Sequence, residues 1–290
     1  MMSRSAIASV AIAVAASAGG GLVVVSFDPA GGTLDDNVRV VSEGGTYGEN
    51  ANLYPSGSPA NFSDLPSNKI TLADGVFAYS TSDRWCNYWS RPIANIVAGR
   101  PYTYVIDVLS YANESSAGPW FNIGHTGNDQ PAQLSWASAQ VTGAGRHVRN
   151  LTGRTVESYT TLGRDYVDFN HSDGGVCSMT FRVQLYAGKD AVPADGAYAA
   201  SGECVAMPLP VPARPGFTFA GWRNAAGEAV TSATVVPAGE RHTLTAAWRR
   251  NPGTVVPVKV TFDANGGQVK EKFRIVNTEQ PFGQIGRAHV

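Results

Sequence analysis

The chain is built from short segments in which apolar and polar residues alternate. Phe217–Trp222 and His242–Trp248 both show this period of two, which is typical of strands with one buried face. Pro215-Gly216 directly precedes the first segment and favours a turn, because Pro fixes φ and Gly tolerates positive φ. The pattern predicts a small β-rich module in the C-terminal third of the chain.

The middle of the chain, residues 49–202, contains many more segments of this kind. Gly, Asn and Asp residues separate them, which is typical of an antiparallel β-sandwich or jelly roll. The strands that we expect here are Lys69–Leu72, Gly75–Thr81, Trp85–Ser90, Tyr102–Tyr111, Trp120–His125, His147–Asn150, Thr155–Thr160, Tyr166–Asn170 and Val176–Tyr186.

One strand and the turn that follows it occur twice. Val23–Gly32 and Val258–Gly267 both read V-x-V-[ST]-F-D-x-x-G-G, a β-branched strand that runs into a Gly-Gly turn. The two copies share no reactive residue. The repeat therefore indicates a modular architecture rather than an active site.

Three further motifs extend this repeat: F-D-x-[NA]-G-G, [ML]-P-x-P-x-R-P-G-[FY]-x-F-x-G-W and T-L-x-A-x-W. The segments that carry them, with a second-strand end, are Phe27–Gly32, Thr46–Gly48, Met207–Trp222 and Thr243–Trp248. They resemble the Listeria–Bacteroides repeat (internalin B-repeat) family, whose members are small β-grasp modules strung along extracellular bacterial proteins. The resemblance implies a structural repeat core made of Phe27, Phe217, Phe219, Trp222 and Trp248.

The two halves of this repeat lie far apart, at residues 22–48 and 203–250. We infer one discontinuous repeat with a second domain, residues 49–202, inserted into a loop, as insertion succeeds at surface turns. Phe217, Phe219 and Trp222 should then pack against Val23, Val25 and Phe27. The alternative is two broken half-repeats, neither of which could bury its aromatic face alone.

The inserted segment has a looser resemblance of its own. Asn52-Leu53, Ala98–Thr103 and Phe181–Gly188 are similar to parts of the jelly rolls of carbohydrate-binding modules. The expected fold is mainly β: an antiparallel jelly roll or β-sandwich inserted into a β-grasp-like repeat, followed by a truncated second repeat.

The ends of the chain carry segments outside these domains. Residues 1–20 have the charged, apolar and small-residue regions of a signal peptide, the alternative being an N-terminal helix. Residues 251–257 form a linker and 258–284 a truncated second repeat. Residues 285–290 read as the translation of a sequencing-library adapter, so we interpret them as an artefact.

Composition and charge narrow the function classes. Hydrophobic residues make up 43% and charged residues 16% of the chain, enough apolar content for real cores. The net charge of −1 provides no surplus to neutralise phosphates, so we expect no nucleic-acid partner. The apolar N-terminal run is too short for a stable membrane span.

The three cysteines form no CxxC pair, which excludes a zinc ribbon or a thioredoxin-type site. Cys86 and Cys177 both fall in expected strands, and a disulfide between them is one interpretation for an exported protein. The other treats both as small buried apolar residues.

No sequence motif for catalysis is present: HExxH, the P-loop, GxSxG and a strand-linked GxGxxG are all missing. We therefore expect no enzymatic activity. Asp165 and Asp173 could help to hold a calcium ion, the one cofactor that the pattern allows. The alternative is that they are ordinary turn and strand-end aspartates.

Aromatic residues in the insert give the strongest functional signal. Trp85, Tyr88 and Trp89 lie in one expected strand, and alternation places Trp85 and Trp89 on one face and Tyr88 on the other. Exposed rings stack on sugars, and polar neighbours bind the hydroxyls. The further residues of this glycan platform are Arg84, Asn87, Trp120 and Asn122. The alternative places Trp85 and Trp89 in the core.

These patterns predict a non-catalytic, adhesin-like protein of the bacterial cell surface, with spacer repeats and a jelly roll that binds glycan or cell-wall polysaccharide. A host surface protein is a further partner to consider. One alternative is a phage or prophage tail protein that attaches to host glycans from the virion. The other is a fragment of a cell-wall-active enzyme.

Overall fold

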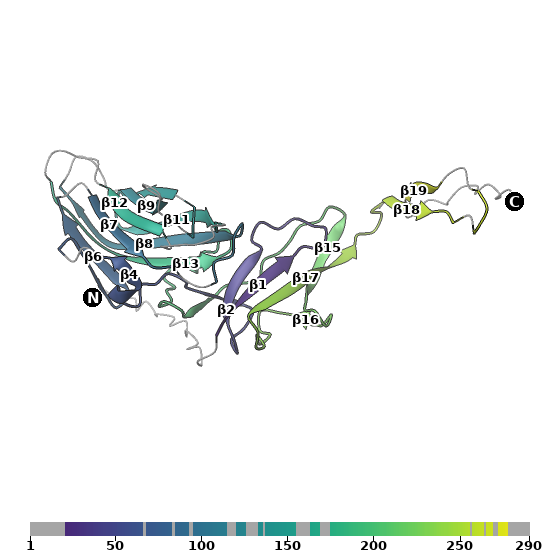
Figure 1. Cartoon of the computed structure of the whole chain (residues 1–290), viewed down its shortest axis with the longest axis horizontal. Coiled ribbons are helices and arrows are strands. Elements are labelled where there is room, and N and C mark those ends of the chain that lie inside the picture. Colours follow the sequence, from purple (N-terminus) through teal and green to yellow (C-terminus); the bar gives the residue numbers. More distant parts are fainter. Residues whose placement is uncertain are drawn as a thin grey trace, which may run out of the picture.

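The chain folds into β-sheets. The computed structural model describes residues 21–65, 68–82, 85–92, 95–114, 120–125, 133–135, 137–154, 163–168, 175–255, 257–263, 265–268 and 272–277. These ranges contain no α-helix, and the only helical element in them is a 3-10 turn, η1 (Pro59–Asn61). Figure 1 shows a sandwich, a smaller sheet and a hairpin in a row. The mainly β fold expected from the sequence is confirmed.

The smaller sheet, here the repeat sheet, joins strands from the beginning of the described chain to strands from residues 217–250. Its strands in order are β16 (Ala229–Val230), β15 (Phe217–Arg223), β17 (Arg241–Arg250), β1 (Leu22–Asp28) and β2 (Val38–Ser42). β1 lies parallel to β17, and all other neighbours are antiparallel. Segments about 200 positions apart in the sequence therefore form one sheet, as the discontinuous-repeat interpretation expects.

One face of the repeat sheet carries an aromatic core. The rings of Phe27 and Trp222 lie 5.0 Å apart, and Val23, Val25 and Leu244 are among the other buried residues of this cluster. Trp222 Nε1 donates a hydrogen bond to the carbonyl oxygen of Pro210 at 2.9 Å, so the buried indole keeps a polar partner. The expected contact between the two halves of the repeat is therefore present.

A β-bulge explains how two aromatic residues of different parity reach this core. The register of β15 against β17 shifts between Phe219 and Gly221, and Gly221 has a φ of +112° that favours glycine. The bulge brings Trp222 to the face of Phe219, and their rings lie 5.3 Å apart. Phe217 differs from the expectation: it lies under the Arg214 guanidinium, 4.0 Å from the ring centre, outside the cluster.

The inserted segment forms an antiparallel sandwich of two sheets. The first, the β9 sheet, contains β10 (Ala137–Gln140), β9 (Trp120–His125), β12 (Gly163–Asp168), β7 (Trp85–Ser90) and β4 (Phe62–Asp64) in that order. The second, the β13 sheet, contains β11 (Gly145–Thr152), β8 (Pro101–Asn113), β13 (Cys177–Ala187), β6 (Val76–Thr81) and β5 (Ile70–Ala73). Strands β4 and β10 were not expected, because three or four residues show no clear period. The expected strand at residues 155–160 lies outside the described residues.

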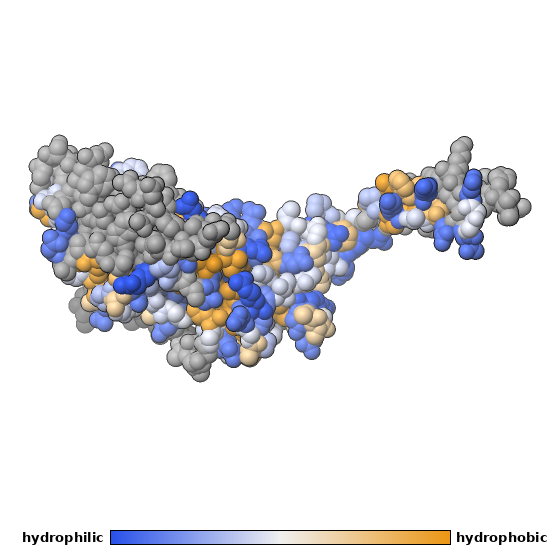
Figure 2. Space-filling view, in the orientation of Figure 1, coloured by the Kyte–Doolittle hydropathy of each residue, from blue (hydrophilic) through white to orange (hydrophobic). Residues whose placement is uncertain are grey.

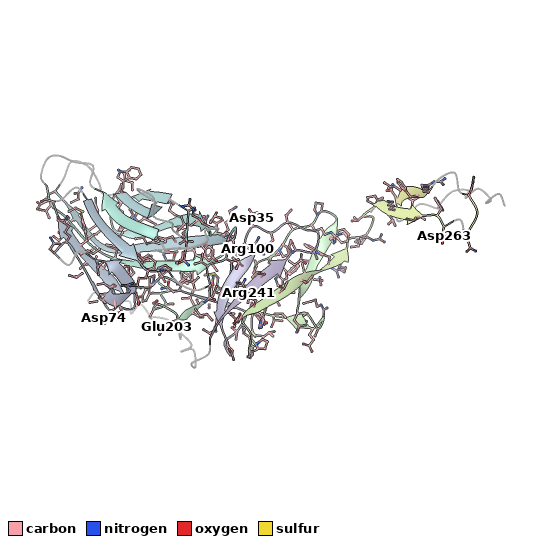
Figure 3. All side chains as sticks on the ribbon, viewed as in Figure 1. Asp35, Asp74, Arg100, Glu203, Arg241 and Asp263 are labelled. Atoms are coloured by element: carbon pink, nitrogen blue, oxygen red, sulfur yellow. The ribbon has the colours of Figure 1, made fainter. Side chains whose placement is uncertain are left out.

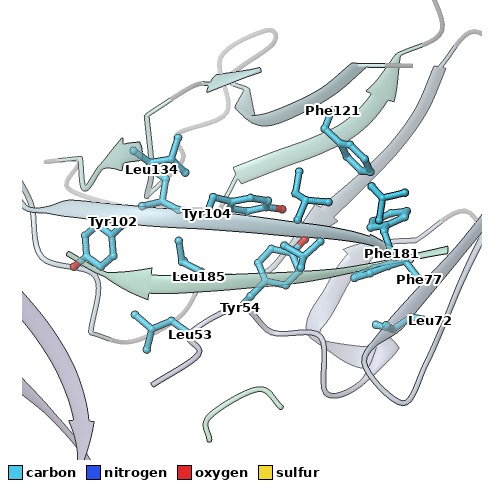
Figure 4. Close-up of a cluster of buried hydrophobic side chains, with 14 of the residues drawn as sticks. Leu53, Tyr54, Leu72, Phe77, Tyr102, Tyr104, Phe121, Leu134, Phe181 and Leu185 are labelled. Atoms are coloured by element: carbon cyan, nitrogen blue, oxygen red, sulfur yellow. The ribbon is translucent and has the colours of Figure 1, made fainter. Parts of the chain in front are cut away.

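Aromatic rings fill the space between the two sandwich sheets (Figure 4). Phe181 of β13 stacks on Phe77 at 5.1 Å and meets Phe121 of β9 edge-on at 4.7 Å. All three side chains are buried. Such ring pairs add to the hydrophobic stabilisation that holds two sheets face to face.

The sandwich is attached to the repeat sheet by a short pair of strands, β3 (Glu49–Ala51) and β14 (Cys204–Ala206). The second face of the repeat sheet also contributes to the attachment, because Val24, Val38 and Val40 belong to the sandwich core. β1 and β2 are therefore covered on both faces. This pairing is compatible with domain boundaries near residues 48 and 203. We propose these boundaries for the inserted domain.

An ion pair between a buried arginine and a partly exposed aspartate lies at the same junction. Arg39, which is only 3% exposed, pairs with Asp36 and donates from Nη1 to the carbonyl oxygen of Ala187 at 3.3 Å. Asn50 Nδ2 donates to the same oxygen at 2.7 Å. Gly188 has a φ of +113°, and a side chain there would collide with the ion pair. Polar and apolar contacts together therefore fix the sandwich on the repeat.

Cys177 and Cys204 are buried and free. Because Cys177 is a free thiol, the disulfide to Cys86 considered above is not formed in the structure. Burial raises the pKa of the Cys177 thiol to about 12, so the group stays protonated near neutral pH. Cys177 therefore acts as a small apolar residue of the sandwich core.

The hairpin beyond the repeat sheet consists of β18 (Pro257–Thr261) and β19 (Phe273–Asn277). It begins where the second copy of the repeat was expected. Val258, Phe273 and Ile275 are all more than 40% exposed, and Figure 2 shows apolar residues on the surface of this hairpin. Its described part does not bury the apolar face that β1 buries in the first copy.

We expect the sandwich to lose stability at alkaline pH. Burial raises the pKa of Tyr102 to about 12, above its value of about 10 in an unfolded chain. The folded state therefore holds the proton more tightly, and its stability is full below pH 10 and falls as the pH rises towards 12. Denaturant unfolding across this range measures the fall. In Tyr102→Phe the fall should be smaller, and an unchanged fall would contradict the assignment.

Candidate functional site

The predicted aromatic platform lies on two strands of the β9 sheet. In the register of this sheet, Trp85 of β7 is opposite Asp168 of β12, and Asp168 is opposite Trp120 of β9. Directly opposed residues of neighbouring strands lie on the same face of a sheet. Positions 85 and 120 therefore share a face, separated by two strand spacings or about 10 Å.

Burial in β9 shows which face this is. Phe121 is 1% exposed and contacts Phe181 across the core, so its face is the inner one. Trp120 is on the other face and is 38% exposed, and its partner Gln140 on β10 is exposed as well. Position 85 is consequently on the outer face of the sheet. The register thus favours the platform interpretation over the core interpretation for this strand.

The next rows of the same face bring in more of the predicted residues. Asn87 and Asn122 are both opposite Tyr166, and Trp89 is opposite Arg164. The outer face of the β9 sheet, which we call the platform face, therefore collects five predicted positions: 85, 87, 89, 120 and 122. The side chains of all but Trp120 lie outside the described part of the chain, so the register concerns their backbone.

Two predicted residues fall elsewhere. Position 88 has the parity of Cys86 and lies opposite Asp165, on the face of Phe121. We therefore do not include Tyr88 in the platform face. Arg84 lies outside the described residues.

Strand β12 adds positions that sequence reasoning did not select. Arg164, Tyr166 and Asp168 occupy the row between β7 and β9 on the platform face. Their alternation of charged and aromatic residues is visible in the sequence, but only the pairing of β12 with both neighbours gives them a place in the site. Aromatic, amide, basic and acidic residue types at positions on one face are the types that bind a ligand with apolar ring faces and many hydroxyls.

The calcium hypothesis remains untested. Asp165 lies in β12, and Asp173 lies outside the described residues. Among the residues that the structure describes, no group of three or more His, Cys, Asp and Glu side chains could hold a metal ion.

The outer face of the β13 sheet offers a hollow of about 450 Å³. Four of its lining residues carry hydroxyl groups that bond to one another in pairs: Ser80 Oγ to Ser178 Oγ and Ser110 Oγ to Thr180 Oγ1, both at 2.7 Å. These hydroxyl groups therefore already have hydrogen-bond partners within the sheet. We regard the platform face as the better candidate.

The remainder of that outer face is covered by the chain itself. Val105 and Tyr186 pack beneath Ala191 and Ala199 of the segment that returns to the repeat. Arg146 Nε donates to Asp107 Oδ1 at 2.6 Å, and this bond raises the pKa of the Arg146 guanidinium. The salt bridge and the covering segment close this end of the sheet to a ligand.

Comparison with known families supports the repeat. A family model described as the Listeria-Bacteroides repeat domain matches residues 167–247. The match begins in β12 and continues through β13 to β17, whereas the strand that lies beside β17 in the repeat sheet is β1. The family model is aligned to one continuous stretch of sequence. It therefore does not include the first half of the domain, which lies about 200 residues upstream of β17.

Solved structures give weaker likenesses. A xylan-binding module, CBM86, from Roseburia intestinalis is 11% identical with a TM-score of 0.24, covering 42% of this chain and 83% of that chain. A family 29 carbohydrate-binding module from Piromyces equi is 10% identical with a TM-score of 0.23, covering 59% and 93%. The tripod from the baseplate of bacteriophage Tuc2009 is 17% identical with a TM-score of 0.32, covering 90% and 98%.

No curated protein matches the sequence. Within the described ranges, no helix has the length and hydrophobicity that a transmembrane span requires. At such low TM-scores, the function of the chain has to be argued from its own residues. What the comparisons add is that residues 167–247 match the Listeria-Bacteroides repeat domain.

Proposed function

We propose that this protein is a non-catalytic, adhesin-like protein of the bacterial cell surface whose sandwich binds glycan on the platform face. The observation that carries the proposal is the backbone register of Trp85, Asp168 and Trp120, in which two tryptophan positions flank an aspartate position on one face of a sheet. The repeat sheet acts as the module that attaches this sandwich to the rest of the chain. Resemblance to repeats of extracellular bacterial proteins supports the location.

The dimensions of the platform face suit a chain of sugars. Trp85 and Trp89 are four residues apart along β7, or about 13 Å, and Trp120 is two strands away. Several rings spread over one face of a sheet can stack on successive sugar units, while Asn87 and Asn122 bind hydroxyls between them. No acid–base pair belongs to this proposal, since binding needs only shape and hydrogen bonds.

The same modules would also serve a phage or prophage tail protein. The distinction lies at the N-terminus, where a cell-surface protein needs a signal peptide and a virion protein does not. Expression in a secreting bacterium and mass spectrometry of the product test this point. Cleavage after Ala18 supports the cell-surface protein, and an intact N-terminus supports the tail protein. A catalytic domain encoded further downstream would instead favour the cell-wall-active enzyme.

A glycan array with the full chain tests the binding itself. We expect binding to bacterial or host polysaccharides, and Trp85→Ala or Trp120→Ala should each weaken it about thirtyfold, because truncating a central aromatic residue of an interface typically costs about 2 kcal/mol. Leu109→Ala is the matched control, since Leu109 is an exposed apolar residue on the other sheet. A folded chain that binds no glycan, or tryptophan variants that bind as the control does, would refute the proposal.

A further inference from the structure

The β18–β19 hairpin reproduces the β1–β2 pair of the repeat sheet. Both pairs are antiparallel with the same register, and the connection between their strands has the same length. After β1, the backbone N of Ala30 donates to Asp28 Oδ1 at 2.8 Å. After β18, the backbone N of Asn265 donates to Asp263 Oδ1 at the same distance of 2.8 Å. The hairpin is therefore a folded copy of the first half of the repeat.

In the first copy, the two faces of β1 and β2 have different partners. One face carries Val23 and Val25, which belong to the aromatic core of the repeat. The other, which we call the docking face, carries Val24, Val38 and Val40, and these belong to the sandwich core. The second half of the repeat therefore packs on one face only, and the inserted sandwich covers the docking face.

The docking face of the hairpin is apolar as well. In the shared register, larger residues of β19 take the places of Val38 and Val40, namely Phe273 and Ile275. Phe273 is 48% exposed and Ile275 is 64% exposed. The second half of a repeat would leave both uncovered, because in the first copy it packs on the opposite face. These two side chains therefore mark a surface for a different partner.

The chemistry of this surface differs from the first copy at one further position. Lys259 stands on β18 where β1 has Val24, and its Nζ lies 4.4 Å from the ring centre of Phe273. The aliphatic part of a lysine covers apolar surface while its charge stays near water. A partner that covers Phe273 therefore needs an apolar strand surface with an acidic or carbonyl group beside it for the lysine.

The ion pair at the sandwich junction also has a counterpart in the second copy. Arg39 pairs with Asp36 and donates to the carbonyl oxygen of Ala187 in the sandwich. In the register of the hairpin, Arg274 takes the place of Arg39. Glu271 precedes it by the same spacing by which Asp36 precedes Arg39. The second copy thus repeats both the apolar and the charged residue types by which the first copy holds its sandwich.

The sandwich described above does not cover this surface. It is already engaged with the first copy through Val24 and Val40, which lie in its core. Figure 3 labels Asp74 in the sandwich and Asp263 in the hairpin towards opposite ends of the molecule, with the repeat sheet between them. In the described structure, the docking face of the hairpin is therefore open to another partner.

We propose that the docking face of the hairpin seats a second β-sandwich, inserted after β19 as the first is inserted after β2. In the first copy the chain reaches the sandwich through Thr46–Gly48, and the equivalent positions after β19 are Pro281–Gly283, again an aromatic residue followed by Gly. The protein is then a series of units in which each repeat carries its own sandwich. This arrangement is independent of the ligand that the platform face binds.

An extended chain tests the proposal. Residues 49–250 are attached after Gly283 in place of residues 284–290, so that the hairpin receives both a sandwich and the second half of a repeat. A reference chain receives residues 203–250 alone and therefore has no second sandwich. Hydrogen exchange of the β18 and β19 amides is compared between the two chains, each with and without Ile275→Asp.

We expect the second sandwich to raise the protection of β19 about tenfold or more, because it buries two large apolar side chains. Ile275→Asp should abolish this gain and leave the reference chain unchanged. Val276→Asp is the matched control: Val276 is opposite Val258 on the repeat-core face, so the variant should lower protection in both chains. Equal protection of β19 in the two chains, or an equal response to Ile275→Asp, would overturn the proposal.

Sedimentation of the original full chain distinguishes this partner from a second copy of the protein. We expect a monomer, because each copy has its only sandwich engaged with its own β1 and β2. A dimer that Ile275→Asp dissociates would show that a second copy covers the docking face, and this result would also overturn the proposal.

Discussion

Replacing Trp222 with alanine is expected to destabilise the repeat sheet by about 3–5 kcal/mol, the usual cost of removing a buried aromatic side chain. Trp222 is 2% exposed and contacts Phe27 and Phe219. Its indole is also bonded to Pro210, so the variant leaves a cavity and an unpaired carbonyl oxygen. Because Phe27 comes from the first half of the repeat, the loss should spread to β1.

Hydrogen exchange on the full chain measures this effect strand by strand. Amides of β1 and β17 should lose protection in Trp222→Ala, whereas amides of β13, deep in the sandwich, should keep most of theirs. Val211→Ala is the control, because Val211 is 72% exposed and should leave protection unchanged. Unaltered protection of β1 in Trp222→Ala would show that the two halves of the repeat do not depend on each other.

The discontinuous repeat could be predicted because its motifs are specific. The aromatic pattern around Pro215-Gly216 and the matching strand at Val23–Phe27 indicate two halves of one module, and the sheet order agrees. The bulge at Gly221 could not be predicted in the same way. Strict alternation along β15 would place Phe219 and Trp222 on opposite faces of the strand. Only the shifted register against β17 brings both side chains to the same face.

The backbone arrangement of the candidate site could be predicted from the sequence only in part. Alternation places Trp85 and Trp89 on one face of a strand, yet it does not say whether that face meets the core or the solvent. Phe121 is buried and Trp120 is exposed, which identifies the inner and outer faces of β9. The register between β9, β12 and β7 then assigns positions 85 and 89 to the outer face. Tyr166 joins the site through long-range pairing, which a local pattern does not encode.

The valines of β1 show the effect of the insertion on the sequence. Val23 and Val25 face the repeat core, but Val24 between them is also buried, because the sandwich covers the second face. A strand covered on both sides reads as a continuous apolar run rather than as an alternation. The run Leu22–Val25 therefore already indicates that the repeat sheet has a partner on its outer side.

The ion pair at this junction gives the second large effect. In Asp36→Ala the guanidinium of Arg39 stays buried without its carboxylate, and breaking such a pair costs about 3–5 kcal/mol. Denaturant unfolding should show this loss, whereas Asp35→Ala, which removes an exposed partner of Lys189, should leave the stability unchanged.

The double variant Asp36→Ala/Arg39→Met separates the loss of a contact from the cost of an unpaired charge. Replacing both members of a buried pair by apolar groups is often close to neutral, so the double variant should recover most of the stability lost in Asp36→Ala. Recovery would mean that the pair acts chiefly to seat the sandwich in one orientation against Ala187 and Gly188. If the double variant is as unstable as Asp36→Ala, the apolar contacts of Val24 and Val40 depend on the charged pair, and the two domains unfold as one unit.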